Sequence, residues 1–121
     1  MIRVHTMKIG DLICWGVREP DEWKDTSLNA SMAEFGWILP VTIDSAGVVI
    51  MGQDRVDAAK RAGHAVCPCL FKEFLSEAQC AALAVAEYLL DSVPWDRDGV
   101  SFVEDLLRRV EITMEGASDG K

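Results

Sequence analysis

The sequence of 121 residues is poor in basic residues and has no long apolar run. Twelve lysines and arginines stand against twenty aspartates and glutamates, which gives a formal net charge of −8. This balance excludes a broad phosphate-neutralising face, so we do not expect direct DNA binding. No stretch approaches the roughly 20 apolar residues that span a bilayer, and residues 1–12 have no signal-peptide core. These absences predict a cytoplasmic protein with no membrane partner.

Cysteine is also scarce, with four residues in the chain. Cys67 and Cys69 are two residues apart, so on a strand they would lie on one face. With Cys14 or Cys80 they could form a thiolate zinc site, but this is not the spacing of a zinc knuckle. We therefore predict buried, reduced cysteines and no zinc.

Half of the residues are apolar, and the mass of 13.3 kDa fits one compact domain. We assign it to residues 1–115 and expect a disordered tail at 116–121. Periodicity and turn residues predict an α/β (α+β) fold, with a small mixed sheet, flanking helices and a C-terminal helical pair. The expected strands are 4–9, 41–43, 48–51 and 65–71, and the expected helices run from Thr26 or Ser27 to Gly36, from Gly52 to Gly63, from Ser76 to Leu90 and over 102–114.

Three local features refine this prediction. Pro68 lacks a backbone N–H, which favours an edge position or a bulge for its strand. Ser76 and Gln79 have the spacing of a capping box at the start of a helix. Residues 14–25 have no periodicity and are predicted to form a long loop that Trp15 and Trp23 pack against the core.

The most informative segment is the strand at 48–51, which runs through Gly52 directly into a helix. Such a turn directs free helix amides toward whatever lies above the sheet, and the helix dipole attracts phosphate there. Arg55 would add a positive charge to this site. In the structural alternative, Gly52 only turns the chain, and Arg55 pairs with Asp54 or a neighbouring carboxylate. Spacing alone leaves both interpretations open.

Several segments together resemble the ParB/sulfiredoxin superfamily, most of all the ParB-like domains that accompany phage and bacterial DNA methyltransferases. The resemblance covers about residues 7–107, and its motifs lie at 35–44, 51–63, 66–68, 75–87 and 95–96. It implies a fold in which the glycine-arginine turn holds a nucleoside triphosphate, CTP or ATP, with magnesium. Arg55 matches the best-kept arginine of the family, and its loss is expected to abolish binding while the fold stays intact.

The resemblance also implies roles for individual residues. Arg55 and Glu87 would be the catalytic residues of a nucleotide hydrolase, phosphotransferase or ParB-like nuclease, and Glu87 would place the metal. The residues expected to line the nucleotide site, with the last two near the base or ribose, are Gly52, Gln53, Asp54, Arg55, Pro40 and Val41.

Two departures from the family pattern support a second hypothesis. Gln53 and Asp54 stand where the family has a histidine or glutamate and often a second arginine, and Tyr88 stands where it favours asparagine. The first hypothesis is therefore binding of a nucleotide or of nucleic-acid phosphate, in phage or bacterial DNA metabolism. The alternative is a degenerate scaffold without catalysis that acts as an acidic interaction or regulatory module. It would dock on a DNA-processing protein, or self-associate through residues 102–114.

Overall fold

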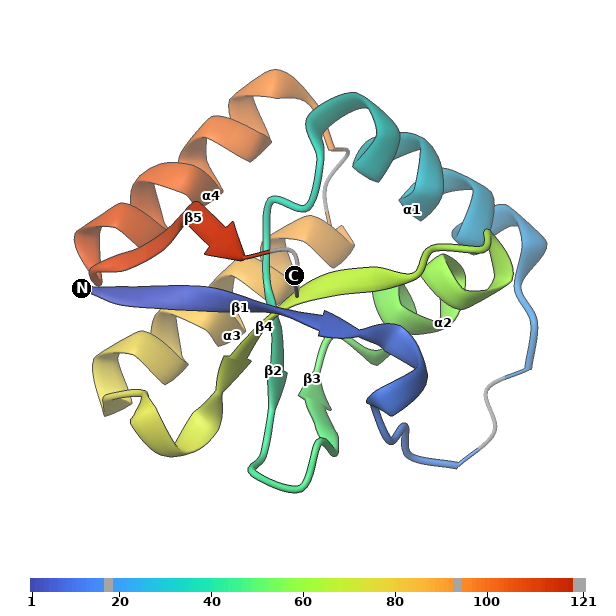
Figure 1. The fold of residues 1–121 in the computed structure, drawn as a ribbon. Helices are drawn as coiled ribbons and strands as arrows, with labels where there is room; N and C mark the ends of the chain where they lie inside the picture. Colours follow the sequence, from blue (N-terminus) through green and yellow to red (C-terminus); the bar gives the residue numbers. More distant parts are fainter. Residues whose placement is uncertain (17–18, 93–94, 119–121) are drawn as a thin grey trace.

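The computed structural model describes residues 1–16, 19–92 and 95–118, with side chains placed except at 92 and 115–118. Over these ranges the chain forms a mixed sheet with four α-helices (Figure 1), which confirms the predicted α/β (α+β) fold. The sheet has five strands where the sequence predicts four. No helix in the described ranges is long and apolar enough to cross a membrane. The elements are β1 (Ile2–Lys8), η1 (Ile9–Asp11), α1 (Glu22–Phe35), β2 (Val41–Ile43), β3 (Val49–Met51), α2 (Gln53–Arg61), β4 (Val66–Phe71), η2 (Lys72–Phe74), α3 (Glu77–Ser92), α4 (Arg97–Arg109) and β5 (Ile112–Ser118).

The strand order in the sheet is β3-β2-β4-β1-β5. The β2–β3 hairpin forms as predicted, and its turn contains Gly47 at φ +87°. β2 and β4 are parallel, β4 and β1 are antiparallel, and β1 and β5 are parallel. Two parallel pairs require crossover connections, which the helices provide.

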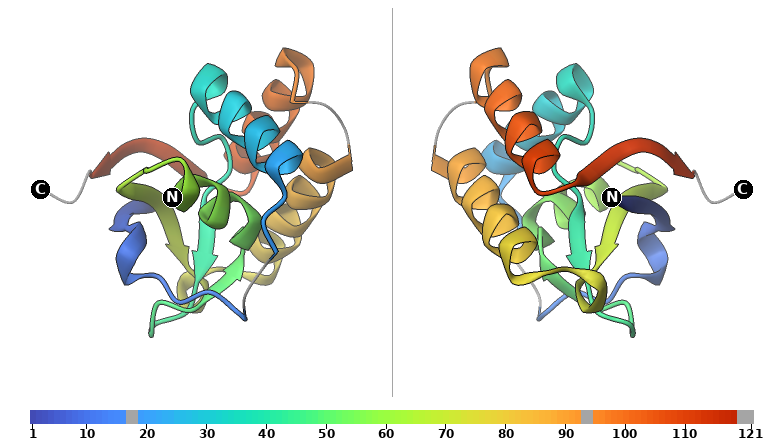
Figure 2. Two further views of the ribbon diagram at one scale, coloured as in Figure 1. Left: turned by 90° about the vertical axis from the view of Figure 1, so that its right-hand side faces the viewer. Right: turned by 90° about the vertical axis from the view of Figure 1, so that its left-hand side faces the viewer.

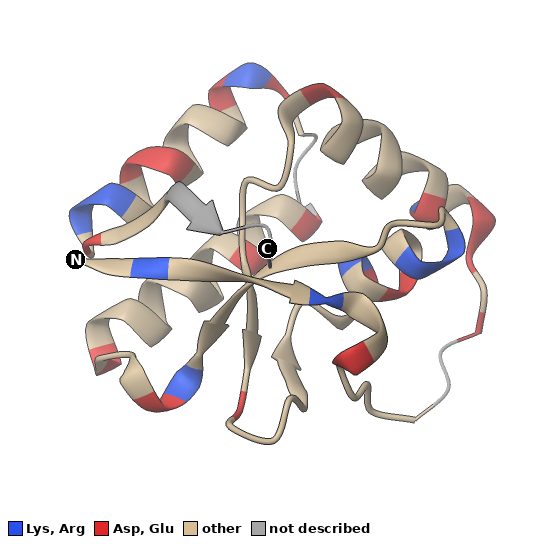
Figure 3. Ribbon diagram, viewed as in Figure 1, with Lys and Arg blue, Asp and Glu red and all other residues tan. Residues whose placement is uncertain are grey.

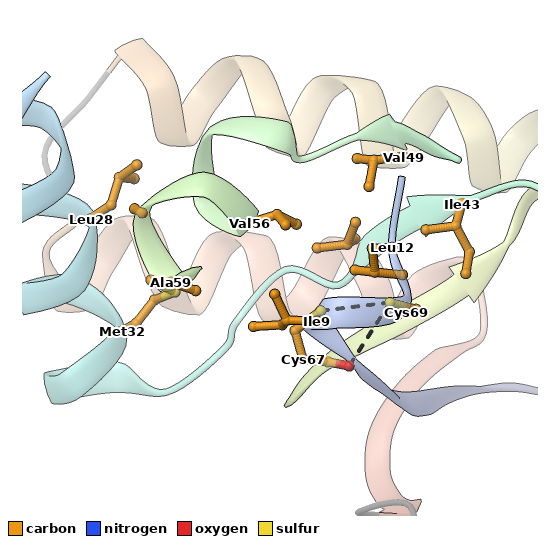
Figure 4. Close-up of a cluster of buried hydrophobic side chains, with 12 residues drawn as sticks. Ile9, Leu12, Leu28, Met32, Ile43, Val49, Val56, Ala59, Cys67 and Cys69 are labelled. Atoms are coloured by element: carbon orange, nitrogen blue, oxygen red, sulfur yellow. Dashed lines mark hydrogen bonds between the residues drawn. The ribbon is translucent and has the colours of Figure 1, made fainter. Parts of the chain in front are cut away.

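The side chains on the two faces of the sheet form separate apolar clusters. One cluster contains buried residues of α1 and α2, and the other contains buried residues of α3 and α4. In both views of Figure 2, α4 lies above α3 beside the sheet. Figure 4 shows the first cluster, in which Met32 of α1 lies next to Ala59 of α2, and Val56 of α2 lies between them and the sheet residues. Because the faces are covered by different helices, α2 and α3 come together only beyond the end of β3.

The predicted helix signals are confirmed at α3, where the capping box forms. The amide of Ser76 donates to Gln79 Oε1 over 2.9 Å, and the amide of Gln79 donates to Ser76 Oγ over 3.1 Å. These two bonds satisfy amides that a helix start leaves without partners.

The start of α1 differs from the prediction. The helix begins at Glu22 rather than after Thr26 or Ser27, and its N-cap is Asp21, whose Oδ1 accepts a hydrogen bond from the Lys24 amide. Acidic side chains at the cap and in the first turn interact favourably with the helix dipole. The cap and these charges favour a helix start at Glu22, inside the segment for which a loop was expected.

The position of Pro68 also differs from the prediction, because β4 lies inside the sheet, between β2 and β1. The β1–β4 register runs from Lys8 to His5 without a shift, so no bulge forms there. Pairing with β2 begins at Cys69, one residue beyond the proline. A residue without an N–H is tolerated here because no residue of β2 pairs with Pro68, so no hydrogen bond to β2 is lost.

The C-terminal segment differs most from the prediction. The helix expected at 102–114 is α4, which ends at Arg109, and Glu111 at φ +61° redirects the chain. Ile112 then enters β5 and pairs with Ile2 of β1, so the C-terminal helical pair is followed by a strand that the pattern did not predict. β5 includes residues 116–118 of the expected tail. Residues 119–121 lie outside the described residues. So does Pro94, at which the sequence predicts that the helix beginning at Ser76 cannot continue.

Candidate functional site

The site begins at the turn between β3 and α2. Gly52 is the N-cap of α2 at φ +100°, a left-handed conformation that disfavours other residues. A Cβ atom at this position would lie 2.6 Å from Arg55 Nη2 and 3.3 Å from Val41 Cγ2. The glycine therefore leaves room for the arginine side chain of its own turn to fold back over it.

Arg55 connects the two helical layers of the molecule. Its side chain is buried, with the residue 4% exposed, and Nη2 donates to Glu87 Oε1 of α3 over 2.6 Å. Nη2 also donates to the carbonyl oxygen of Pro40 over 3.3 Å. The sequence predicts Arg55 and Glu87 as functional residues, and the fold brings them into contact across 32 positions. The structural alternative also has support, since Arg55 pairs with a carboxylate, although with Glu87 and not with Asp54.

A pocket of about 310 Å³ lies where α2 and α3 approach each other beyond β3. Its lining contains three carboxylates and one guanidinium, so its charge is negative overall. The lining residues are Leu28, Ile50, Met51, Gly52, Gln53, Asp54, Arg55, Glu87, Asp91 and Trp95. The four predicted residues of the turn and Glu87 thus share one cavity.

Two turn residues are held by other parts of the chain. Gln53 Oε1 accepts from the Trp15 amide over 2.9 Å, and Gln53 Nε2 donates to the Trp15 carbonyl over 2.7 Å. Asp54 forms an ion pair with Lys24 of α1. These two residues are the ones that depart from the family pattern. In the fold, Gln53 attaches the loop before α1 to α2, and Asp54 attaches α1 to α2.

Pro40 and Val41, expected near the base or ribose, lie behind the pocket. Both are fully buried, and the pocket lining does not include them. Val41 packs in the cluster under α1 and α2, and Pro40 supplies a carbonyl to Arg55. Both therefore lie behind Arg55, on its buried side, and not at the surface of the cavity.

Sequence reasoning missed Asp91 and did not assign Trp95 to the site. Asp91 lies one helical turn after Glu87, so the i, i+4 spacing of two acids on α3 was the available signal. Trp95 Nε1 donates to the Leu90 carbonyl over 3.1 Å, which fixes its ring beside the pocket. Tyr88 is 71% exposed, and the pocket lining does not contain it.

α2 carries three basic residues and two acidic ones, and one of the basic residues packs against α1. Arg61 Nη1 lies 2.7 Å from Asp25 Oδ2, and Asn29 Nδ2 of α1 donates to the Ala58 carbonyl over 3.2 Å. Figure 3 shows that α2 carries both basic and acidic residues. Arg61 therefore stabilises the helix pair, and the pocket lining does not include it.

A larger cavity of about 520 Å³ lies elsewhere, between the end of α1, the end of α4 and β5. Its lining is mainly apolar, and it contains none of the predicted site residues. The smaller pocket is the candidate site because the titratable groups and the helix N-terminus converge there.

The cysteine pair lies in the core. Cys67 and Cys69 are buried in the cluster of Figure 4, with their sulfur atoms 3.7 Å apart. The hydrogen bond with Cys67 and burial together raise the pKa of the Cys69 thiol. The thiolate is the reactive form, so burial suppresses reaction at both residues, and the raised pKa suppresses it further at Cys69.

Thiol labelling tests this placement. With a disulfide reagent at neutral pH, we expect no rapid labelling of Cys67 or Cys69 in the native protein, and full labelling of both in denaturant. Peptide mapping after alkylation identifies the sites. Fast native labelling of either residue would contradict their burial.

Comparison with known proteins gives matches among solved structures. No family model matches the chain, and no curated protein matches it. A solved structure of a Pnob8-like ParB-N domain is similar, with 17% sequence identity and a TM-score of 0.43. The match covers 88% of this chain and 45% of that chain, so this chain spans less than half of its length.

Proposed function

We propose that the pocket between α2 and α3 binds the phosphates of a nucleoside triphosphate, of the CTP or ATP class, as its magnesium complex. The observation that carries the proposal is that α2 starts at the pocket without a side-chain cap. The first amides of a helix lack intrahelical partners, and the positive end of its dipole attracts anions. Phosphate is the anion that such sites bind most commonly.

Arg55 supports the proposal with charge at the same place. In the described part of the chain its hydrogen bonds come only from Nη2, and Nε is buried without an acceptor. A guanidinium with unused donors can form charge-assisted bonds to phosphate oxygens. A small shift of its side chain toward the pocket would be required.

Magnesium is part of the proposal because the pocket is acidic. A triphosphate entering beside Asp54, Glu87 and Asp91 would be repelled unless a cation came with it. Magnesium is commonly held by one or two carboxylates together with substrate phosphates. Glu87 and Asp91 fit this pattern, and the described residues include no cluster of three metal-ligating side chains. Bound there, the ion would neutralise phosphate charge.

The proposed function is binding and does not include turnover. Gln53 is engaged by Trp15, Asp54 by Lys24 and Glu87 by Arg55, so none is held as a general base. We take the setting, phage or bacterial DNA metabolism, from the resemblance of the sequence motifs.

Calorimetric titration with CTP, ATP and GTP, with and without magnesium, tests the proposal. We expect binding in the micromolar range with magnesium and none without it. Asp91→Asn should weaken binding by roughly tenfold, because it removes one carboxylate from the metal's surroundings. The matched control is Asp98→Asn, which makes the same charge change on α4, away from the pocket. Equal effects of both variants, or binding independent of magnesium, would contradict the proposal.

The second candidate is an acidic protein-interaction module. It is favoured by the pairing of Arg55 with Glu87, which cancels the positive charge of the turn, and by the net charge of −8. If no nucleotide binds with magnesium, this candidate gains support. Its partner would be basic, and their association should weaken steeply between low and physiological salt. Salt-independent association would contradict it.

A further inference from the structure

Trp15 lies at the protein surface although the sequence predicts that it packs against the core. Its residue is 70% exposed. A large apolar ring in water is unfavourable, and packing gives no reason for it here. Trp23, predicted to pack in the same way, is 84% exposed on α1.

The backbone of Trp15 is nevertheless fixed. The Gln53 side chain holds both its amide and its carbonyl, at 2.9 and 2.7 Å. Two residues earlier, the Ile13 amide donates to the Gly47 carbonyl over 2.9 Å, and the Val49 amide donates to the Ile13 carbonyl over 2.8 Å. The segment is therefore attached beside β3 through one isolated parallel bridge between Ile13 and Val48, and the indole of Trp15 is left in solvent. Trp23 has no comparable attachment to Gln53 in the described structure.

Gln53 connects this indole to the candidate site. It is the first residue of α2, it lines the pocket, and its amide group binds Trp15. Trp15 itself is not in the pocket lining, but its backbone is fixed to a residue that is. An exposed aromatic ring on a fixed backbone provides a flat face with few rotatable bonds to immobilise. Flat faces of this kind bind nucleobases by stacking, which tolerates every base.

We infer that the indole of Trp15 stacks on the base of the bound nucleotide; this inference rests on the proposed function. Phosphates bind at the start of α2, and the base lies against Trp15. Stacking predicts little discrimination between CTP and ATP, because the π-face of each base is accepted. Gln53 is then a positioning residue, since it acts on the base only through Trp15.

Titration of the full chain with CTP, ATP and inorganic tripolyphosphate, each with magnesium, tests the inference. Trp15→Ala should weaken nucleotide binding by about tenfold or more and leave tripolyphosphate affinity unchanged. Trp15→Phe should keep most of the affinity. The control is Trp23→Ala, which removes an equally exposed indole and should change neither ligand. Quenching of indole fluorescence by nucleotide should be smaller in Trp15→Ala than in the wild-type chain, and the quenching that remains would come from Trp95 in the pocket lining.

The outcomes separate the two proposals. If tripolyphosphate and nucleotides bind but Trp15→Ala leaves nucleotide affinity unchanged, or weakens both ligands equally, the stacking inference fails and phosphate binding stands. An equal loss in Trp23→Ala also overturns it. If neither tripolyphosphate nor any nucleotide binds the wild-type chain, the proposed function fails, and the stacking inference fails with it.

Discussion

Replacing Glu87 by alanine is expected to lower the free energy of unfolding by about 3 kcal/mol, because it leaves a buried guanidinium without its counter-charge. Arg55 is the most deeply buried charged residue of the described part of the chain, and it forms an ion pair with Glu87. The same argument changes the expectation for Arg55→Ala. That variant removes a buried contact between α2 and α3, so it tests stability together with binding. Urea unfolding in nucleotide-free buffer measures the effect.

A double-mutant cycle distinguishes loss of the ion pair from loss of packing. Arg55→Met with Glu87→Leu replaces both charges by apolar groups, and we expect it to recover most of the stability lost in Glu87→Ala. Glu34→Ala is the matched control, because Glu34 is exposed on α1 and its loss should cost less than about 0.5 kcal/mol. Equal stability of Glu87→Ala and Glu34→Ala would show that the pair contributes nothing.

The second large effect is expected for Gly52→Ala. The left-handed backbone alone costs a residue with a Cβ about 1–2 kcal/mol. Here the new Cβ would also lie 2.6 Å from Arg55 Nη2, so the guanidinium must move from Glu87 and from the Pro40 carbonyl. We expect a total loss of at least about 3 kcal/mol in the free energy of unfolding, measured by urea titration.

Gly63→Ala isolates the backbone part of this loss. Gly63 has a similar left-handed φ of +84°, and a Cβ there meets nothing within 4 Å. In Gly63→Ala the free energy of unfolding should fall only by the cost of the left-handed backbone, about 1–2 kcal/mol. If Gly52→Ala and Gly63→Ala unfold at the same urea concentration, the space above Gly52 has no part in holding Arg55.

Local signals in the sequence predicted much of the fold. The hairpin followed from β-branched runs around a glycine turn, and the start of α3 followed from the spacing of Ser76 and Gln79. The sequence was less informative about strands whose position depends on pairing with distant segments. The pattern at 112–118 did not predict β5, because its pairing partner, β1, is at the other end of the chain. Pro68 led to the prediction of an edge strand, because the sequence does not reveal that the pairing of β4 with β2 begins only at Cys69.

For the candidate site, the sequence by itself determined the turn. Gly52 redirects the chain, α2 then presents its first amides, and Arg55 is the nearby cation. These properties depend on neighbours within a few residues. Only the tertiary structure decided what Arg55 does, because Glu87 and the Pro40 carbonyl come from distant segments. It also decided that Gln53 holds Trp15 and that the pocket is acidic. Charge and exposure at a site are sums over elements far apart in the chain, and only packing brings those elements together.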